Sequence, residues 1–577
     1  MRARTSRVLA TFLTIGLIGA AYAPAKAADE PNLEGRWKLL LISPLRESEV
    51  VLLEIKKHDS KYETAIVGSA LPAQVPAAAK GAEVKDGKVT VDLKLGMMDF
   101  QLKGKVGKDG NIYGTMDFRG NITAARLDKT DVKVITPNPN EGSAAIKDYM
   151  ESRQQKDPKA KVKLLTKILE KEGNSPKLAM VYADILGLAE AAGLSEKTVK
   201  EFVDTLVENA KPYGERFEAE AQAVALKALA GQKANAALAL EVGLKAEKAL
   251  EPEASTETRA DLWQGIAAAA KLAGNKEMTA EAEAKVLAYD ARLDEEYHKT
   301  HPPFKPEAFA GRKEGDRVVL LELFTGSECP PCVAADVAFD AVNLAYKPTE
   351  VVTLQYHLHI PGPDPLTNSD AIARSEYYPE IQGTPSTFFN GKAEAGGGGD
   401  LSMSKGKYDD FLQVIGGLLK EKKKADIDLK VEQEGEELKI KATAKAEATA
   451  GDAKGKKESK LKLRLALIEE QVRYPGRNKV RFHHHIVRSM PGGPVGKAFE
   501  GGEAKFEQTV SLASVRKTIE TYLSDFTKEN GSSFSAPLPS VSLENVSVVA
   551  FVQDDEDKSV LHAVLVPVSK AKAAAGE

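Results

Sequence analysis

The pattern of apolar and polar positions divides the chain into four regions. Residues 28–136 form short runs in which apolar and polar residues alternate, separated by turn signals, which predicts an antiparallel β barrel or sandwich. Residues 140–300 have a helical period and predict an α-helical region. Residues 307–424 mix buried strands with helices, and residues 425–568 return to strand patterns that predict a β-sandwich. The expected fold class is therefore a multidomain α+β protein.

The third region contains the stretch that points most directly to chemistry. The apolar run Val318–Phe324 predicts a parallel strand buried on both faces, and Thr325–Ser327 ends it. Cys329-Pro330-Pro331-Cys332 follows, and a helical pattern over Val333–Leu344 begins at once. This order places Cys329 at a helix amino terminus, where unpaired N–H groups and the macrodipole favour a thiolate. The prolines suit the first helical turn, which needs no N–H donor.

The residues that follow extend this pattern. A second buried strand is expected at Val351–His359, a helix at Asn368–Tyr378, a loop, strand and Asn-Gly turn at Gly383–Lys392, and a closing helix at Tyr408–Lys420. In this order the region resembles the thioredoxin superfamily, with Thr384-Pro385 similar to the family's cis-proline loop. The resemblance implies a thioredoxin-like α/β domain over residues 307–424.

The resemblance also implies roles for individual residues. Cys329 would be the nucleophile that forms a mixed disulfide with a protein substrate, and Cys332 the resolving thiol, so that the two form a redox-active disulfide. Thr384 and Pro385 would bind substrate backbone, with a cis bond before Pro385. The family usually has an aromatic residue before the first cysteine, whereas this chain has Glu328, whose charge opposes thiolate formation.

Glu322 lies on the strand before the cysteines. In thioredoxin-like proteins an acidic residue on this strand can deprotonate the resolving thiol, and Glu322 matches that position only with one extra residue in the turn. A glutamate in a strand buried on both faces is costly, which itself indicates a role. Glu322 is therefore a candidate catalytic residue.

Two histidines are expected near the cysteines. Parallel strands joined by a right-handed crossover end at the same edge of a sheet, which brings His357 or His359 close to Cys329 and Cys332. A histidine there would tune the thiolate or shuttle protons, complete a copper or zinc site with the cysteines, or be structural. The run His483–His485 lies in a predicted strand, so its alternate members face opposite sides and do not converge on one metal.

The first 27 residues have the pattern of a secretory signal peptide. Three arginines precede the apolar run Val8–Ala23, and Ala25-Lys26-Ala27 supplies a cleavage site. The alternative is a membrane anchor, but glycines interrupt the run and it is shorter than the roughly 20 residues that a spanning helix needs. No later stretch has the length and apolarity to span a bilayer. We therefore expect a secreted or periplasmic protein without stable membrane insertion.

Composition narrows the functions further. The chain of 577 residues contains 2 cysteines, so the pair is either a redox couple or part of a metal site completed by histidine or carboxylate. The formal net charge is −4 and becomes −8 without the signal peptide, so no nucleic-acid partner is expected. No cofactor is implied. The helical region loosely resembles tetratricopeptide hairpins and serves either partner binding or spacing, and the C-terminal sandwich is expected to be immunoglobulin-like.

These observations favour a secreted thiol-disulfide oxidoreductase that acts on protein thiols and disulfides. Two alternatives remain open. One is a non-catalytic exported binding or scaffold protein with a thioredoxin-like module, and the other is a metallochaperone that uses thiols and histidines.

Overall fold

The computed structural model describes residues 31–59, 61–118, 121–138, 140, 142–252, 254–446, 460–531, 534 and 538–568. The predicted signal peptide, residues 1–27, lies outside this part of the chain. The chain divides into two compact units, one ending at Leu293 and the other beginning at Asp294. No described helix combines the length and the apolar character needed to cross a membrane.

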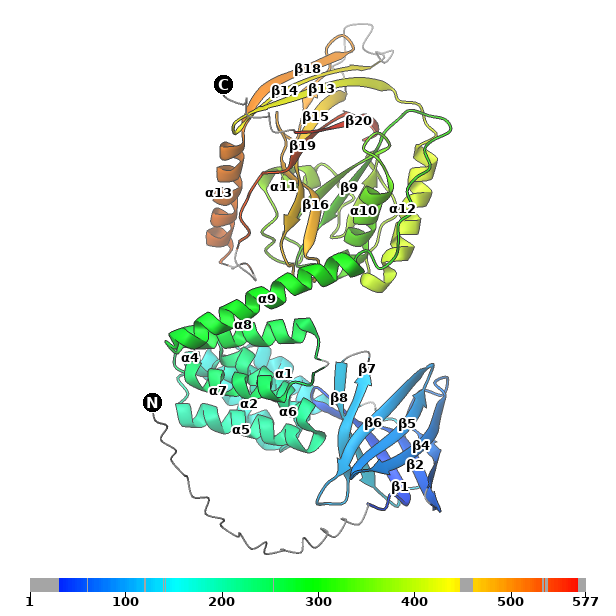
Figure 1. Ribbon diagram of the computed structural model, residues 1–577, viewed down its shortest axis with the longest axis vertical. Coiled ribbons are helices and arrows are strands. Elements are labelled where there is room, and N and C mark those ends of the chain that lie inside the picture. The colour runs from blue at the N-terminus through cyan, green and yellow to red at the C-terminus, as the bar shows by residue number, and fades with distance from the viewer. Residues whose placement is uncertain are drawn as a thin grey trace, which may run out of the picture. The chain divides into compact units, whose positions relative to one another are not determined.

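The first unit begins with a closed antiparallel barrel of eight strands in sequence order, drawn in blue in Figure 1. Along each strand, every second side chain points into the barrel, where Trp37, Leu53 and Leu102 are buried. This confirms the prediction of an antiparallel β barrel or sandwich and selects the barrel. The strands are β1 (Gly35–Ser43), β2 (Arg46–His58), β3 (Lys61–Ser69), β4 (Ala77–Lys85), β5 (Lys88–Leu95), β6 (Met98–Val106), β7 (Ile112–Phe118) and β8 (Asn121–Lys129).

Helices follow the barrel, as the helical period predicts. Neighbours in sequence pack together, and Leu165, Ile185 and Leu226 lie in their shared core. The tetratricopeptide resemblance stays a prediction. The helices are α1 (Ser143–Gln154), α2 (Pro158–Glu172), α3 (Ala179–Gly187), α4 (Ala189–Ala192), α5 (Glu196–Ala210), α6 (Glu215–Leu229), α7 (Ala236–Ala249), α8 (Thr256–Leu272) and α9 (Lys276–Thr300), with 3-10 turns η1 (Pro176–Leu178) and η2 (Lys211–Tyr213).

The second unit is built on one large mixed sheet in the order β12-β11-β9-β10-β16-β15-β19-β20, with β17 paired to β15. A separate sheet has the order β13-β14-β18. The strands are β9 (Val319–Thr325), β10 (Val351–His357), β11 (Ser386–Phe389), β12 (Lys392–Ala393), β13 (Ala425–Glu434), β14 (Glu437–Ala446), β15 (Leu461–Arg473), β16 (Phe482–Ser489), β17 (Lys497–Ala498), β18 (Glu503–Ser511), β19 (Val546–Asp554) and β20 (Val560–Pro567).

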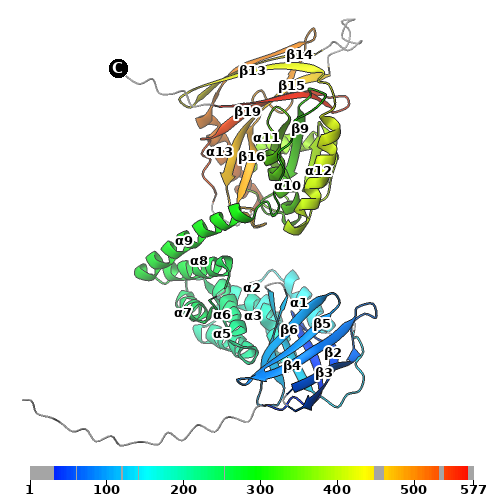
Figure 2. The ribbon, with the colours of Figure 1, turned by 45° about the vertical axis from the view of Figure 1, so that its right-hand side comes forward.

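Helices cover both faces of the large sheet where it carries the cysteines. On one face Val319, Leu321 and Leu323 pack against α10 and α12, which lie side by side in Figures 1 and 2. On the other face Leu320 and Phe324 share a core with α11. The helices of this unit are α10 (Val333–Ala345), α11 (Ser369–Glu376), α12 (Ser404–Leu418) and α13 (Leu512–Asn530), with 3-10 turns η3 (Pro330–Cys332) and η4 (Leu401–Met403).

This topology corrects the predicted domain boundary at residue 424. The expected immunoglobulin-like sandwich over residues 425–568 is wrong as a separate domain, because β16, β15, β19 and β20 continue the sheet begun by β9 and β10. The sheet also curls back on itself, since the backbone N–H of Val560 donates to the Asn390 carbonyl at 2.9 Å. Residues 307–424 therefore complete their sheet with strands from the end of the chain.

Candidate redox site

Cys329 and Cys332 form a disulfide at the start of a helix. The β9 strand ends at Thr325, and Cys329 stands at the N-cap of η3, which leads directly into α10. The two Cα atoms are 5.4 Å apart. Cys329 is 2% exposed and Cys332 is 0% exposed, while the two intervening prolines are exposed. The sequence analysis predicted this position at a helix start, because an apolar strand followed by a short turn and two prolines favours a helix beginning there.

The loop at Thr384-Pro385 lies against the first cysteine. The peptide bond between these residues is cis, as expected. The Thr384 hydroxyl donates to Cys329 Sγ at 3.4 Å, and the Thr384 carbonyl oxygen is 3.7 Å from the same sulfur. The structure therefore brings together two elements that lie 55 residues apart in sequence.

A glycine loop closes the other side of the disulfide turn. Gly399 N–H donates to the Pro331 carbonyl at 2.7 Å, and the Gly399 carbonyl accepts from Ala334 N–H at 3.0 Å. A Cβ on Gly398 would overlap the Pro331 carbonyl and lie 2.9 Å from Pro385 Cδ. Only glycine allows this close approach of the loop to the Cys-Pro-Pro-Cys segment.

Glu322 does not have the role that the sequence suggested. It faces the core shared with α11, whereas the helix that follows the cysteines packs on the opposite face of the sheet. Its carboxylate accepts two hydrogen bonds from Arg374, each 2.9 Å long, and one of 2.7 Å from the Tyr378 hydroxyl. Strand alternation determines this outcome, because β9 turns residues 320, 322 and 324 to one face and residues 319, 321 and 323 to the other. Glu322 is therefore one half of a buried ion pair.

Asp336 is the acidic residue that lies on the cysteine side, and the sequence analysis missed it. It is one helical turn beyond Cys332 on α10 and is 2% exposed. Its Oδ1 accepts from the Thr325 hydroxyl at 2.7 Å and from Gln355 Nε2 at 3.3 Å, while Oδ2 has no hydrogen-bond partner among the described residues. Burial raises the pKa of Asp336 well above its ordinary value. The available signal was the spacing of Asp336, Asp340 and Asn343, which places three polar residues along one side of an otherwise apolar helix.

His357 connects this carboxyl to the turn before the cysteines. Its Nδ1 lies 3.0 Å from Asp364 Oδ2, and its Nε2 lies 3.3 Å from Gln355 Oε1. The Nε2 of the same glutamine donates to Asp336 Oδ1. Asp364 Oδ2 also accepts from Ser327 N–H at 2.5 Å. Burial raises the pKa of Asp364, but the His357 imidazole and backbone N–H donors outweigh burial and hold that pKa below its ordinary value. A continuous hydrogen-bonded chain thus runs behind the disulfide turn.

His359 and His483 pack against other aromatic side chains. His359 lies 3.1 Å from the Tyr522 hydroxyl and stacks on Phe526 of α13, and burial lowers its pKa to about 4. His483 packs edge-on against His357, and burial lowers its pKa to about 3. Neither His357 nor His359 forms a ligand set with the disulfide-bonded cysteines.

The remaining members of the triple-histidine run diverge. His484 pairs with Asp340 at 2.8 Å, and His485 pairs with Glu470 at 3.1 Å. Within the described residues, no group of three or more histidine, cysteine or acidic side chains is arranged to hold a metal ion.

Comparison with known proteins adds little to this geometry. No protein-family model and no curated protein matches the chain. Among solved structures, HBP35 of Porphyromonas gingivalis is similar at 16% identity and a TM-score of 0.31, over 46% of this chain and 80% of that chain. A similarity at that level supports no conclusion about the fold or the activity of this chain.

Proposed function

We propose that this protein is a thiol-disulfide oxidoreductase that acts on protein cysteines. The observation that carries the proposal is the contact of Cys329 Sγ with the cis Thr384-Pro385 loop, at the beginning of a helix. Helix termini of this kind favour a thiolate, and a backbone carbonyl beside the sulfur is a natural partner for an extended substrate.

The reaction needs two exchanges. In the reducing direction, the Cys329 thiolate attacks a substrate disulfide and forms a mixed disulfide, and the first substrate sulfur leaves as a thiolate that takes up a proton. The Cys332 thiol then loses its proton and attacks Cys329 Sγ. The Cys329–Cys332 disulfide re-forms, and the second substrate sulfur leaves. Two electrons pass from the enzyme dithiol to the substrate, and a thiol reductant must restore the dithiol.

Asp336 is the residue we assign as proton acceptor for Cys332. It is one turn along the same helix, it is buried, and its Oδ2 has no partner among the described residues. A raised pKa suits a group that must both take and return a proton near neutral pH. The hydrogen bonds from Thr325 and Gln355 hold its other oxygen in place.

Trapping the mixed disulfide tests this proposal. Cys332→Ser should accumulate a covalent adduct with a disulfide-bonded protein substrate, whereas the matched Cys329→Ser variant should form none. Wild-type protein should turn over the substrate in the presence of a thiol reductant. If wild type shows no turnover and neither variant forms an adduct, the module is a non-catalytic binding unit.

We also infer that residues 1–27 direct export and are then removed. The three arginines, apolar run and Ala25-Lys26-Ala27 of this segment support the inference. An oxidising compartment suits a chain whose two cysteines are paired. Amino-terminal sequencing of the native protein should begin near Ala28, and an intact Met1 would overturn the inference.

A further inference from the structure

The loop that follows β10 makes contacts with both α13 and the disulfide turn. His359 begins this loop and Asp364 ends it, because the Asp364 N–H donates to His359 Nδ1 at 2.9 Å. The segment between them is Ile360-Pro361-Gly362-Pro363, and its two prolines have no N–H to donate to the backbone. The imidazole therefore supplies the acceptor that closes the loop.

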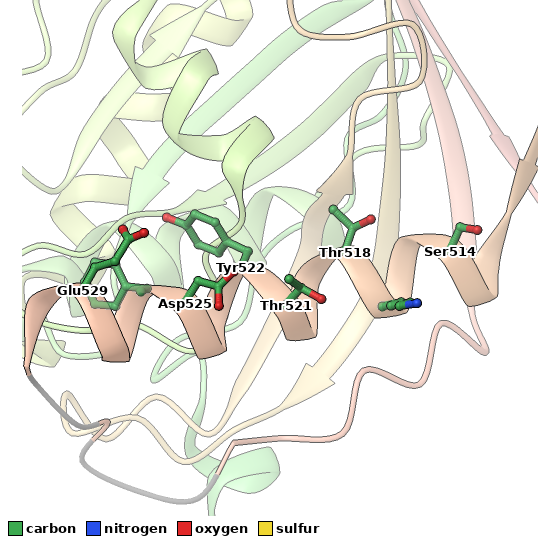
Figure 3. A pocket seen from close by; sticks show the side chains of 8 residues that line it. Ser514, Thr518, Thr521, Tyr522, Asp525 and Glu529 are labelled. Carbon is green, nitrogen blue, oxygen red and sulfur yellow. The ribbon is translucent and has the colours of Figure 1, made fainter.

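The other nitrogen of the same ring contacts α13. His359 Nε2 lies 3.1 Å from the Tyr522 hydroxyl, and the ring stacks on Phe526 with a distance of 3.6 Å between centroids. Because Nδ1 accepts from a backbone N–H, the proton of the neutral ring is on Nε2, which donates to Tyr522. Figure 3 shows Tyr522 on α13, where it borders an open groove along that helix. The neutral ring thus joins the loop to a helix that comes 163 residues later.

The Asp364 end of the loop holds the turn before the first cysteine. Asp364 Oδ2 accepts from Ser327 N–H at 2.5 Å, and its Oδ1 accepts from Leu366 N–H at 2.8 Å. Asp364 and Ser327 are both 0% exposed. In the same turn, the Cys329 N–H donates to the Gly326 carbonyl at 3.1 Å. Asp364 therefore helps to set the direction in which the chain leaves β9 and reaches Cys329.

The Ile360 end of the loop holds the hydroxyl group beside the sulfur. The Thr384 hydroxyl lies 3.3 Å from the Ile360 carbonyl oxygen and 3.4 Å from Cys329 Sγ, so these two acceptors share one proton. A Cβ on Gly326 would lie 2.7 Å from the same carbonyl oxygen, which shows how closely the loop approaches the turn. A shift of the loop would therefore alter both the turn and the donor that faces Cys329 Sγ.

We propose that His359 is a positioning residue for Cys329, because it anchors to α13 the loop that holds the cysteine turn and the Thr384 hydroxyl. This inference rests on the proposed thiol-disulfide exchange and makes α13 part of its machinery. His359 acts through its neighbours Asp364 and Ile360, as a neutral ring with two hydrogen bonds, and carries no charge or proton to the sulfur. Such positioning matters because a misplacement of about 1 Å can slow a reaction about 100-fold.

The rate of the first exchange tests the inference. Cys332→Ser leaves Cys329 as the one thiol of the full-length chain. The probe is dithiobis(nitrobenzoate): the Cys329 thiolate attacks its disulfide, a mixed disulfide forms, and a coloured thiolate leaves. In this background His359→Phe keeps an aromatic ring for Phe526 but removes the bonds to Asp364 and Tyr522. We expect its second-order rate constant to fall about tenfold, because the loop is no longer closed.

His562→Phe in the same background is the matched control. His562 Nδ1 also accepts from a backbone N–H, that of Val318 at 3.3 Å, but next to the opposite end of β9 from the cysteines. Urea denaturation measures the stability that each substitution costs. His562→Phe should lose stability and still react at the rate of its Cys332→Ser parent.

Tyr522→Phe provides a milder variant that removes one hydroxyl group and should slow Cys329 about threefold. If His359→Phe does not fold, this variant carries the test, and a parental rate in it would overturn the inference. An unchanged rate in a folded His359→Phe would also overturn it, as would a His562→Phe that slows Cys329 equally, because lost stability would then be the cause. A parent that releases no coloured thiolate would refute the proposed function itself and the inference with it.

Discussion

The two faces of the sheet at β9 each bury a carboxylate, and the two carboxylates differ in their partners. On the α11 face, Glu322 is fully paired with Arg374 and Tyr378. On the α10 face, Asp336 accepts from Thr325 and Gln355 through one oxygen and leaves the other without a partner among the described residues. Burial alone therefore does not identify a functional acid. The first carboxylate joins α11 to the sheet, and the second keeps the free oxygen that the proposed proton transfer requires.

The largest change in stability is expected from breaking the ion pair between Glu322 and Arg374. Glu322→Gln should lower the free energy of unfolding by about 3–5 kcal/mol, because it leaves the Arg374 charge buried without its counter-ion. Urea denaturation measures this change. Glu394→Gln, an exposed position near β12, should be close to wild type. A loss of disulfide exchange without loss of stability in Glu322→Gln would restore the catalytic role that the sequence suggested.

Acid should next weaken the packing of His483 against His357. His483 packs on His357 and has a folded pKa of about 3, well below its ordinary 6.5. A histidine with a lowered folded pKa contributes its stability fully above the unfolded pKa and loses it as pH falls toward the folded pKa. Wild type should therefore lose roughly 3–5 kcal/mol between about pH 6.5 and pH 3 from this residue. In His483→Gln that part of the loss should disappear from the pH dependence of denaturation midpoints, and an unchanged profile would contradict it.

On the side with the unpaired oxygen, substitution of Asp336 should change both the rate of disulfide exchange and the pH dependence of stability. Asp336→Asn keeps an acceptor for Thr325 but removes the proton acceptor, so the resolving step should slow about 100-fold. Because the folded pKa of Asp336 is raised, wild type loses stability as pH rises above the unfolded pKa, and the asparagine variant should not. Stopped-flow disulfide exchange and alkaline denaturation measure the two effects, with Asp410→Asn, exposed on α12, as the control. Wild-type rates in Asp336→Asn would remove this residue from the mechanism.

The smallest effect concerns the glycine loop that contacts the disulfide turn. Gly398→Ala should cost about 1–3 kcal/mol, because its Cβ would overlap the Pro331 carbonyl. Gly396→Ala, whose Cβ would meet nothing within 4 Å, is the matched control. Thermal denaturation compares them, and equal midpoints would show that the loop yields without cost.

Much of the fold around the cysteines could be predicted, because each step rests on local physics. An unbroken apolar run such as Val318–Phe324 indicates a strand covered on both faces, and the prolines after Cys329 indicate a helix start. The parallel pairing of β9 with β10 follows from the connection between them and is observed from Val319 with Val351 to Thr325 with His357. The antiparallel strands of the first region also followed from their alternation, which did not decide between a barrel and a sandwich.

The assignments that went wrong depend on long-range pairing. Alternation in β15 and β16 predicts a strand with one face buried, but it does not specify which sheet that strand joins. Gln355 lies opposite Ile486, 131 residues later, and no local pattern encodes that choice. Long-range pairing also explains why the wrong acidic residue was chosen. The partner of Glu322 is Arg374, 52 residues away, so the sequence did not show that this carboxylate is paired. Asp336, in turn, looked like an ordinary helix position.

The late strands of the large sheet have a consequence for biosynthesis. β16 borders β10, and Val560 of β20 bonds to Asn390, so the Cys-Pro-Pro-Cys segment acquires these neighbours only after the strands up to β20 have been synthesised. Until then β10 has an unprotected edge, and pairing over such separations is intrinsically slow. An emerging chain would therefore carry two cysteines beside an open strand until β16 and β20 have been synthesised. A compartment or chaperone that delays oxidation until β20 has emerged would serve this architecture well.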